Sequence, residues 1–207
     1  MPSHTITRAA FDLCGGHAAL DLVNSLGDRF LPGGPVERLT DYGALLGFTV
    51  DVGLLGAAHA RRLARAQAAL GERAVHAARE LREALAAALY AHVRGRAIAA
   101  ADLHTLGRHF LRAQRHRELR QPGTGGGALR WEWGRFAGRA ELPVWLLAQS
   151  AAELVTSDAL AHVSACAAES CGWLFLDTSR NHSRRWCDMK VCGNRMKARR
   201  FHARHEA

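Results

Sequence analysis

The sequence predicts a mainly α-helical protein with a few short strands, built as a helical domain over residues 1–160 and a small cysteine-rich unit over residues 161–207. Three observations lead to this prediction. Residues 54–93 are rich in Ala, Leu, Arg and Glu, which are strong helix formers. Stretches with strand-like alternation are few and short. Four of the five cysteines lie in the last 42 residues, in a tail too small to build an apolar core of its own.

The first elements follow from local signals. Within residues 11–30, Gly15-Gly16 predicts a short strand or turn that leads into a helix. Pro and Gly make residues 31–35 a loop. Thr40-Asp41 supplies a cap for a short helix over residues 41–47, since short polar side chains bond the first free amides of a helix.

Longer helices fill the middle of the chain. Gly71 divides residues 54–93 into two helices, and the second carries an apolar stripe at helical spacing. The remaining segments, in chain order, are a helix over residues 99–117, a flexible break at 121–127, a strand within 128–133 and a helix over 142–157 that begins near Pro143.

The net charge of +9 is carried by one end of the chain. Nine of the 28 basic residues lie between Thr178 and Ala207, opposed only by Asp188 and Glu206, which gives this segment a charge of +7. The preceding residues carry +2. Such a basic end favours an acidic partner. No signal peptide and no bilayer-spanning run is present in the sequence, so we expect a cytoplasmic protein that does not bind membranes.

Two cysteine pairs with equal gaps point to a metal. The spacing Cys166-x4-Cys171 and Cys187-x4-Cys192 is how a small unit gathers four thiolates around one structural zinc ion. Gly172 follows the second cysteine of the first pair, and Gly193 follows that of the second; both allow sharp turns. Four sulfurs would complete the coordination sphere, so the metal is not expected to be catalytic.

Other interpretations of the cysteines compete with zinc. Two disulfides are disfavoured in a reducing cytosol, four unrelated thiols are disfavoured by the spacing, and an iron–sulfur cluster is a lesser competitor. A nearby histidine could replace one cysteine, the candidates being His182, His202 and His205.

The rest of the tail predicts a hairpin and a basic helix. Residues 173–177 are strand-like, 178–183 form a turn and 184–187 return beside the first strand. Asn194 can cap a helix from Arg195 to Arg204 that has little apolar surface to bury. We therefore predict a nucleic-acid-binding surface. Its cations are Arg184, Arg185, Arg195, Lys197, Arg199, Arg200 and Arg204.

Asp21 and Asn24 are the other candidates. They lie three residues apart, hence on one side of a helix, and they either bond nearby backbone or line a ligand pocket. No phosphate loop, nucleophile elbow or paired-carboxylate signature is present in the sequence, so we expect no catalytic residue and no enzyme.

The tail resembles a known family. "CGNR" at residues 192–195, preceded by "RRWC" at 184–187 and "CGWLFLD" at 171–177, resembles the CGNR zinc finger of bacterial proteins. "GGHAALDLVNSL" at 15–26 resembles the start of the ABATE domain that usually precedes that finger. The resemblance implies that the protein is a stress-induced transcription regulator. It also implies that the four cysteines are zinc ligands and that Arg195 and the following basic helix form the DNA-binding face.

The leading interpretation is a zinc-binding transcription regulator that binds double-stranded DNA. Its N-terminal domain would sense a small-molecule effector or form a homodimer. Three alternatives stay open at this point: an adaptor that grips an acidic protein, an RNA- or ribosome-binding factor, and an enzyme that uses His17, Asp21 and Asn24.

Overall fold

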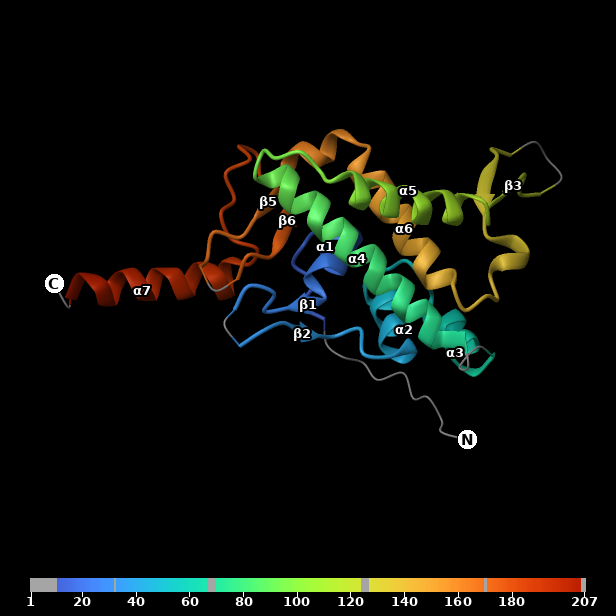
Figure 1. Cartoon of the computed structure of the whole chain (residues 1–207), viewed down its shortest axis with the longest axis horizontal. Coiled ribbons are helices and arrows are strands. Elements are labelled where there is room, and N and C mark those ends of the chain that lie inside the picture. The colour runs from blue at the N-terminus through green and yellow to red at the C-terminus, as the bar shows by residue number, and fades with distance from the viewer. Residues whose placement is uncertain (1–10, 32, 67–69, 124–126, 170, 206–207) are drawn as a thin grey trace.

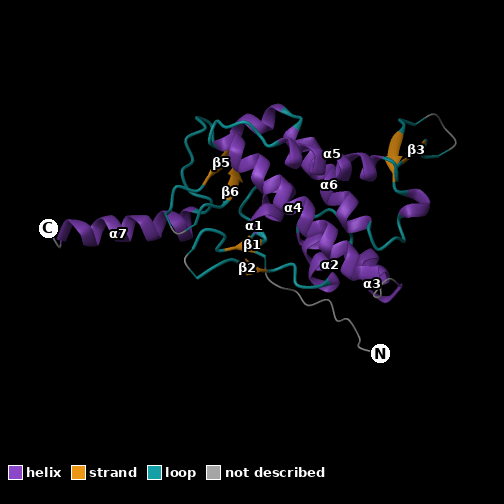
Figure 2. Ribbon diagram, in the orientation of Figure 1, coloured by secondary structure: helices purple, strands orange, loops and turns teal. Residues whose placement is uncertain are grey.

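The computed structural model describes residues 11–31, 33–66, 70–123, 127–169 and 171–205. In these ranges helices predominate and strands occur as short antiparallel pairs (Figures 1 and 2), so the predicted mainly α fold is confirmed. In chain order the elements are α1 (Ala18–Asn24), β1 (Leu26–Gly27), β2 (Val36–Glu37), α2 (Tyr42–Asp51), α3 (Ala57–Ala66), α4 (Gly71–Val93), α5 (Ala100–Gln114), β3 (Glu118–Arg120), β4 (Arg130–Glu132), the 3-10 helix η2 (Gly134–Phe136), α6 (Leu142–Val155), the 3-10 helix η3 (Asp158–His162), β5 (Val163–Ala165), β6 (Leu174–Leu176), the π-helical turn η4 (Met189–Gly193) and α7 (Asn194–His205).

Three helices form the centre of the molecule. α4 crosses it diagonally in Figure 1, and α5 and α6 pack against α4 and against each other. α1 lies against α4 and α6, while α2 contacts α3, α4 and α6. Their apolar side chains form one core, in which Leu20, Phe48, Leu85 and Leu147 are fully buried. Because α1 is too short to be stable alone, this packing is what holds it as a helix.

Two predicted helix boundaries have clear physical causes. Asp41 caps α2, since its side chain accepts a hydrogen bond from the Ala44 amide at 2.9 Å. α4 begins at Gly71, where the sequence places the break between two helices. A Cβ on Gly71 would lie 2.5 Å from the Cβ of Tyr42, so the absence of a side chain lets the starts of α2 and α4 touch.

The predicted hairpin of the tail is wrong in its partner strand. β6 lies inside the predicted strand 173–177, but it pairs with β5, which places Ser164 opposite Phe175. Residues 184–187 form no strand and contact the hairpin through the Ala167 amide, which donates to the Arg185 carbonyl at 2.9 Å. The reason is that the first cysteine pair needs a tight loop, and the β5–β6 connection supplies it.

The tail packs directly onto the helical domain. Val163 and Leu174 belong to the main core, and the Leu176 amide donates to the Gly15 carbonyl at 2.8 Å. α7, in contrast, projects beyond the body of the protein (Figure 1). Among the described helices, none is long and apolar enough to cross a membrane.

Candidate metal centre

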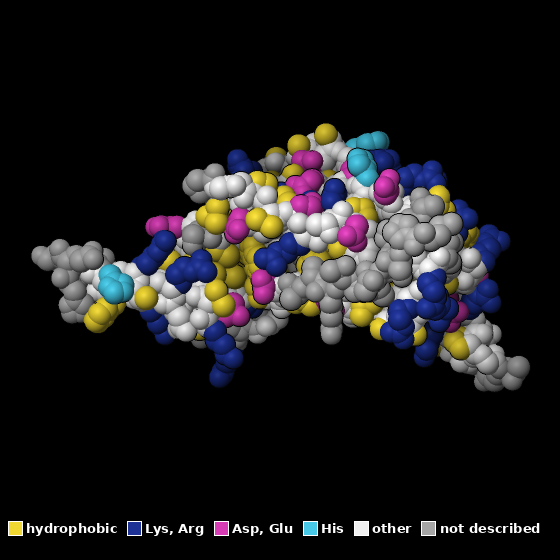
Figure 3. All heavy atoms as spheres, turned by 90° about the horizontal axis from the view of Figure 1, so that it is seen from below, with side chains coloured by type: hydrophobic (Ala, Val, Ile, Leu, Met, Phe, Trp, Pro, Cys, Tyr) yellow, Lys and Arg dark blue, Asp and Glu magenta, His cyan; other side chains and the backbone are white. Residues whose placement is uncertain are grey.

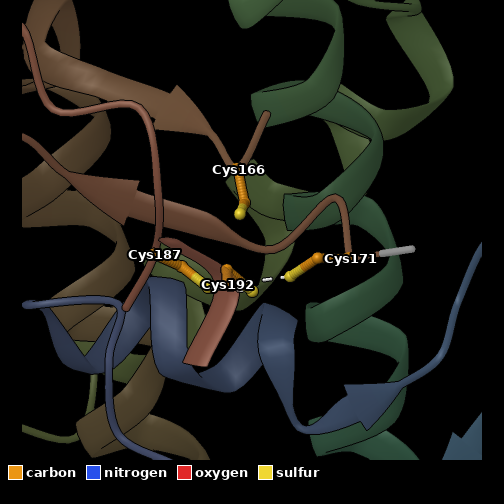
Figure 4. A group of neighbouring side chains, drawn as sticks. All are labelled: Cys166, Cys171, Cys187 and Cys192. Atoms are coloured by element: carbon orange, nitrogen blue, oxygen red, sulfur yellow. Dashed lines mark hydrogen bonds between the residues drawn. The ribbon is translucent and has the colours of Figure 1, made fainter. Parts of the chain in front are cut away.

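Four cysteines from three parts of the tail meet at one point. Cys166 directly follows β5, Cys171 lies in the loop before β6, Cys187 precedes η4 and Cys192 lies within η4. Their Sγ atoms all lie within 4.8 Å of one another and point toward a common centre (Figure 4). The predicted four-cysteine group therefore exists in the fold, and no histidine replaces any of its members in the described residues.

The spacing of the sulfurs fits a single tetrahedral ion. A zinc ion bound at about 2.3 Å by four thiolates separates neighbouring sulfurs by about 3.8 Å. The Cys171 and Cys187 sulfurs are 3.6 Å apart, and those of Cys187 and Cys192 are 3.7 Å apart. All five cysteines are free thiols, which excludes the disulfide interpretation for this structure. A cluster of several irons would spread the thiolates further than this group allows.

The four thiols also perturb one another's proton affinity. Hydrogen bonds, first from Cys171 and then from Cys187, lower the pKa of the Cys166 thiol to about 2. The bond that Cys171 donates to Cys166 raises the pKa of Cys171 to about 12. Four thiolates this close cannot all be ionised without a positive charge between them. Zinc bound by Cys166, Cys171, Cys187 and Cys192 would supply that charge and cross-link the tail.

Aromatic side chains pack around the metal centre. Phe175 is fully buried beside Cys166, Cys187 and Cys192, and Trp173 and Trp186 pack around it. These side chains supply the aromatic part of the small apolar cluster around the cysteines.

The basic helix begins earlier than predicted. Asp188, not Asn194, caps the helical segment, since its side chain accepts from the Lys190 amide at 2.6 Å and the Val191 amide at 3.1 Å. Asn194 already has helical backbone angles and is the first residue of α7. Gly193 also lies in this helical segment rather than at a sharp turn. The extra turn exists because Cys192 must face the other sulfurs.

Arg184 has a structural role that differs from the predicted contact with nucleic acid. Its guanidinium donates to the carbonyls of Trp186 at 2.8 Å and Cys14 at 3.3 Å, and also to that of Cys187. It stacks over Phe175, with 4.5 Å between its Cζ and the ring centroid. These bonds join the residues around the second cysteine pair to the N-terminal segment, and the contact of Arg184 with nucleic acid stays a prediction.

The other predicted cations surround the metal centre and line α7. Arg185, Arg195, Lys197 and Arg199 are exposed, and Arg199 lies 3.5 Å from Glu169 in a pair open to solvent. Figure 3 shows Lys and Arg side chains on more than one side of the projecting end. The two other predicted cations are Arg200 and Arg204, whose side chains lie outside the described part of the structure.

Lys190 is an exposed cation that the sequence analysis did not include in the nucleic-acid surface. It lies in the extra turn that places the start of the helix before Asn194. The signal that could have revealed it is Asp188, because an Asp three residues before Val191 is as good a cap as the Asn that was chosen.

Asn24 joins the helical domain to the tail. Its side-chain amide donates to the Leu174 carbonyl at 2.8 Å and accepts from the Leu174 amide at 3.0 Å. Asn24 therefore occupies the free edge of β6 as a neighbouring strand would.

Asp21 also bonds backbone. It accepts from the Gly15 amide at 2.8 Å, and burial raises the pKa of Asp21 to about 6. The side chains of Asp21 and Asn24 therefore both make the contacts of the backbone-bonding alternative, and neither lines the cavity beside the metal centre or the two cavities beside α5.

Cys14 is the neighbour of the metal centre that sequence reasoning missed. It is half-buried, packs against the cysteine cluster and hydrogen bonds with Cys187. It comes from the segment before α1, more than 150 residues away in the chain. Spacing within the tail carries no information about such a contact.

A helical domain followed by a compact four-cysteine centre and a projecting basic helix defines a zinc-finger protein. Residues 16–158 match the family model ABATE, described as "Putative stress-induced transcription regulator", and residues 162–205 match the CGNR zinc finger. The first match covers most of the chain, so the protein belongs to the ABATE family and carries a CGNR zinc finger after that domain. A search of curated proteins finds no match.

Proposed function

We propose that this protein is a transcription regulator that binds double-stranded DNA through the surface made by η4 and α7. The observation that carries the proposal is the geometry of α7, a helix that leaves the metal centre, projects from the body and has a basic sequence. Such a helix buries little of its own surface in the protein, and duplex DNA offers the dense negative charge that its cations match.

Charge and rigidity support the same proposal. The segment from Thr178 to Ala207 carries +7, and one zinc ion with four thiolates changes this by −2, which leaves it basic. Cys192 would fix the first turn to the metal, so the helix loses less freedom on binding than a loose basic tail would. Phosphate contacts supply affinity without sequence choice, while Arg195 near the start of the helix is the candidate for reading a guanine edge.

We propose a binding role rather than a catalytic one. Four cysteine sulfurs complete a tetrahedral site and leave no position for water or substrate. The N-terminal domain then serves as a sensor or a dimerisation unit.

A second function is favoured by one observation. Met189, Val191 and Phe201 are exposed apolar residues along the same helical segment. Apolar side chains among cations suit an acidic protein partner better than a phosphate backbone does. An adaptor that grips an acidic protein is therefore the competing proposal.

A salt titration tests the DNA proposal. Fluorescence anisotropy of the zinc-loaded protein with a DNA duplex and an RNA duplex of the same sequence gives the affinity at each salt concentration. Replacing Lys197, Arg200 and Arg204 with Gln should weaken binding to every DNA duplex. It should also reduce the magnitude of the log-affinity against log-salt slope by about 0.9 for each lost contact.

A matched variant removes the same charge elsewhere. Replacing Arg61, Arg62 and Arg65 with Gln takes three cations from α3 and should leave DNA binding unchanged. If the α7 variant binds DNA as tightly as the parent while its zinc content is intact, α7 is not the DNA surface. The adaptor proposal then moves ahead, and a preference for the RNA duplex would favour an RNA-binding factor.

A further inference from the structure

A cavity of about 380 Å³ opens in the N-terminal domain, away from the zinc finger. It lies where α4, α5 and the start of α6 meet. Its volume is within the range of small-molecule sites in proteins. The residues around it divide into an apolar floor and a cationic mouth.

The floor of the cavity is apolar and firmly packed. Val144 and Trp145 from α6 are each 3% exposed, and Ala77 from α4 lies beside them. The Trp145 ring is held by His116, which stacks on it with 4.0 Å between the ring centroids and 10° between the planes. A floor held in this way is formed before any ligand arrives, which reduces the ordering that binding would require.

The mouth carries three arginines from three segments: Arg73 on α4, Arg112 on α5 and Arg139 before α6. Only one carboxylate lines the cavity with them. Glu141 lies 4.0 Å from Arg112 and 4.0 Å from Arg139, the outer limit of an ion pair. Arg73 makes no hydrogen bond or ion pair with any described residue. The guanidinium groups therefore keep donors free for a second oxyanion.

The remaining polar group at the cavity does not offset this charge. His109 is 6% exposed, and burial lowers its pKa, so its ring is neutral at neutral pH. Its Nε2 contacts Glu80 at 2.9 Å, and Glu80 also accepts from Arg108 at 2.6 Å. Glu80 is thus already paired away from the cavity. Three arginines and Glu141 leave a net charge of +2 around the mouth.

We propose that this cavity binds a small organic oxyanion, a carboxylate or a phosphate monoester with an apolar body. Arg112 and Arg139 hold the anionic head in place of their long contacts to Glu141, and Arg73 adds a third donor. The apolar body lies against Ala77, Val144 and Trp145. The inference goes beyond DNA binding, and its test does not depend on α7.

Calorimetric titration of the zinc-loaded full chain tests the proposal with four probes. Benzoate and phenyl phosphate carry the head and the body, benzamide keeps the body without the charge, and inorganic phosphate keeps the charge without the body. At least one of the first two should bind with a dissociation constant of about 1 mM or tighter. Benzamide and inorganic phosphate should each bind about tenfold more weakly or worse. The stronger of the two organic anions identifies the head group.

Variants locate the site. The double substitution Arg112→Gln and Arg139→Gln should weaken the bound anion about tenfold or more, because it removes charged donors. Arg115→Gln, at the residue that follows α5 and does not line the cavity, should leave binding unchanged. Failure of both organic anions to bind, equal binding to the double variant, or benzamide or inorganic phosphate binding as tightly as the stronger organic anion would each overturn the proposal. Any of these results leaves the DNA titration unaffected.

Discussion

Replacing Asn24 with Ala should destabilise the whole protein, because Asn24 is the polar contact between α1 and the zinc finger. Asn24 is 4% exposed and Leu174 is fully buried. The substitution removes two hydrogen bonds and leaves the Leu174 amide and carbonyl buried without partners. Each unsatisfied group costs about 1–3 kcal/mol, so we expect the free energy of unfolding to fall by about 4 kcal/mol.

Urea unfolding followed by circular dichroism measures this change. For a chain of this length, 4 kcal/mol corresponds to a fall of about 8–16 °C in the melting temperature. Asn24→Asp should be at least as damaging, since it places a carboxylate oxygen against the Leu174 carbonyl. Asn181→Ala, at an exposed asparagine of the tail, is the matched control and should change stability by less than about 0.5 kcal/mol.

A loss of less than about 1 kcal/mol for Asn24→Ala would refute the reasoning, because two buried backbone groups cannot be left unpaired at so small a cost. Loss of zinc without loss of helix stability would refute it in another way. That result would mean that the finger unfolds independently of the helical domain.

Three further predictions concern the surroundings of the metal centre. Cys171→Ser should abolish stoichiometric zinc in metal analysis, whereas Cys14→Ser should keep one ion per chain; loss of zinc in the latter would make Cys14 a ligand. Arg184→Gln should lower the free energy of unfolding in urea by about 2–4 kcal/mol through lost bonds to carbonyls and to the Phe175 ring, while Arg185→Gln, at an exposed site, should change it by under about 0.5; equal effects would contradict the structural role of Arg184. Burial raises the pKa of Asp21 from 3.8 to about 6, so the folded state binds the proton more tightly than the unfolded state. This residue's contribution to stability should therefore fall by about 3 kcal/mol in total as the pH rises from well below 3.8 to well above 6, and by about 2 kcal/mol of that between about pH 4 and about pH 6. Asp21→Asn should remove that fall, and parallel pH curves for the two proteins would contradict it.

The sequence was sufficient for features that depend on local signals. The cysteine spacing predicted the metal ligands, because the two cysteines of each pair are close in the chain and only fifteen residues separate the pairs. Asp41 predicted the start of α2 through the side-chain cap that the structure contains. Gly71 predicted the break before α4, and the structure adds a reason that the sequence did not show, the close approach of Gly71 to Tyr42.

What the sequence could not show depends on tertiary contacts. The charge of Arg184 is visible in the sequence, whereas its acceptors at Cys14, Trp186 and Cys187 come together only in the fold. Asn24 offered two roles at the sequence level, and its partner lies 150 residues further along the chain. The prediction that residues 184–187 pair with β6 was wrong, because strand propensity does not say which segment completes a strand pair.

The zinc finger and the helical domain share their interior, and this limits how each can move. Val163 and Leu174 are part of the main core, and Cys166 directly follows β5, so a ligand of the metal is anchored in the packing of the domain. In the chain, β5 is preceded by η3 and α6, and Glu141, the residue just before α6, lines the arginine-lined cavity. A tetrahedral site tolerates little displacement of its sulfurs, and a packed core transmits strain rather than absorbing it. The floor of the arginine-lined cavity, Val144 and Trp145, belongs to the same core as Val163 and Leu174, so the cavity and the finger rest on one packed interior.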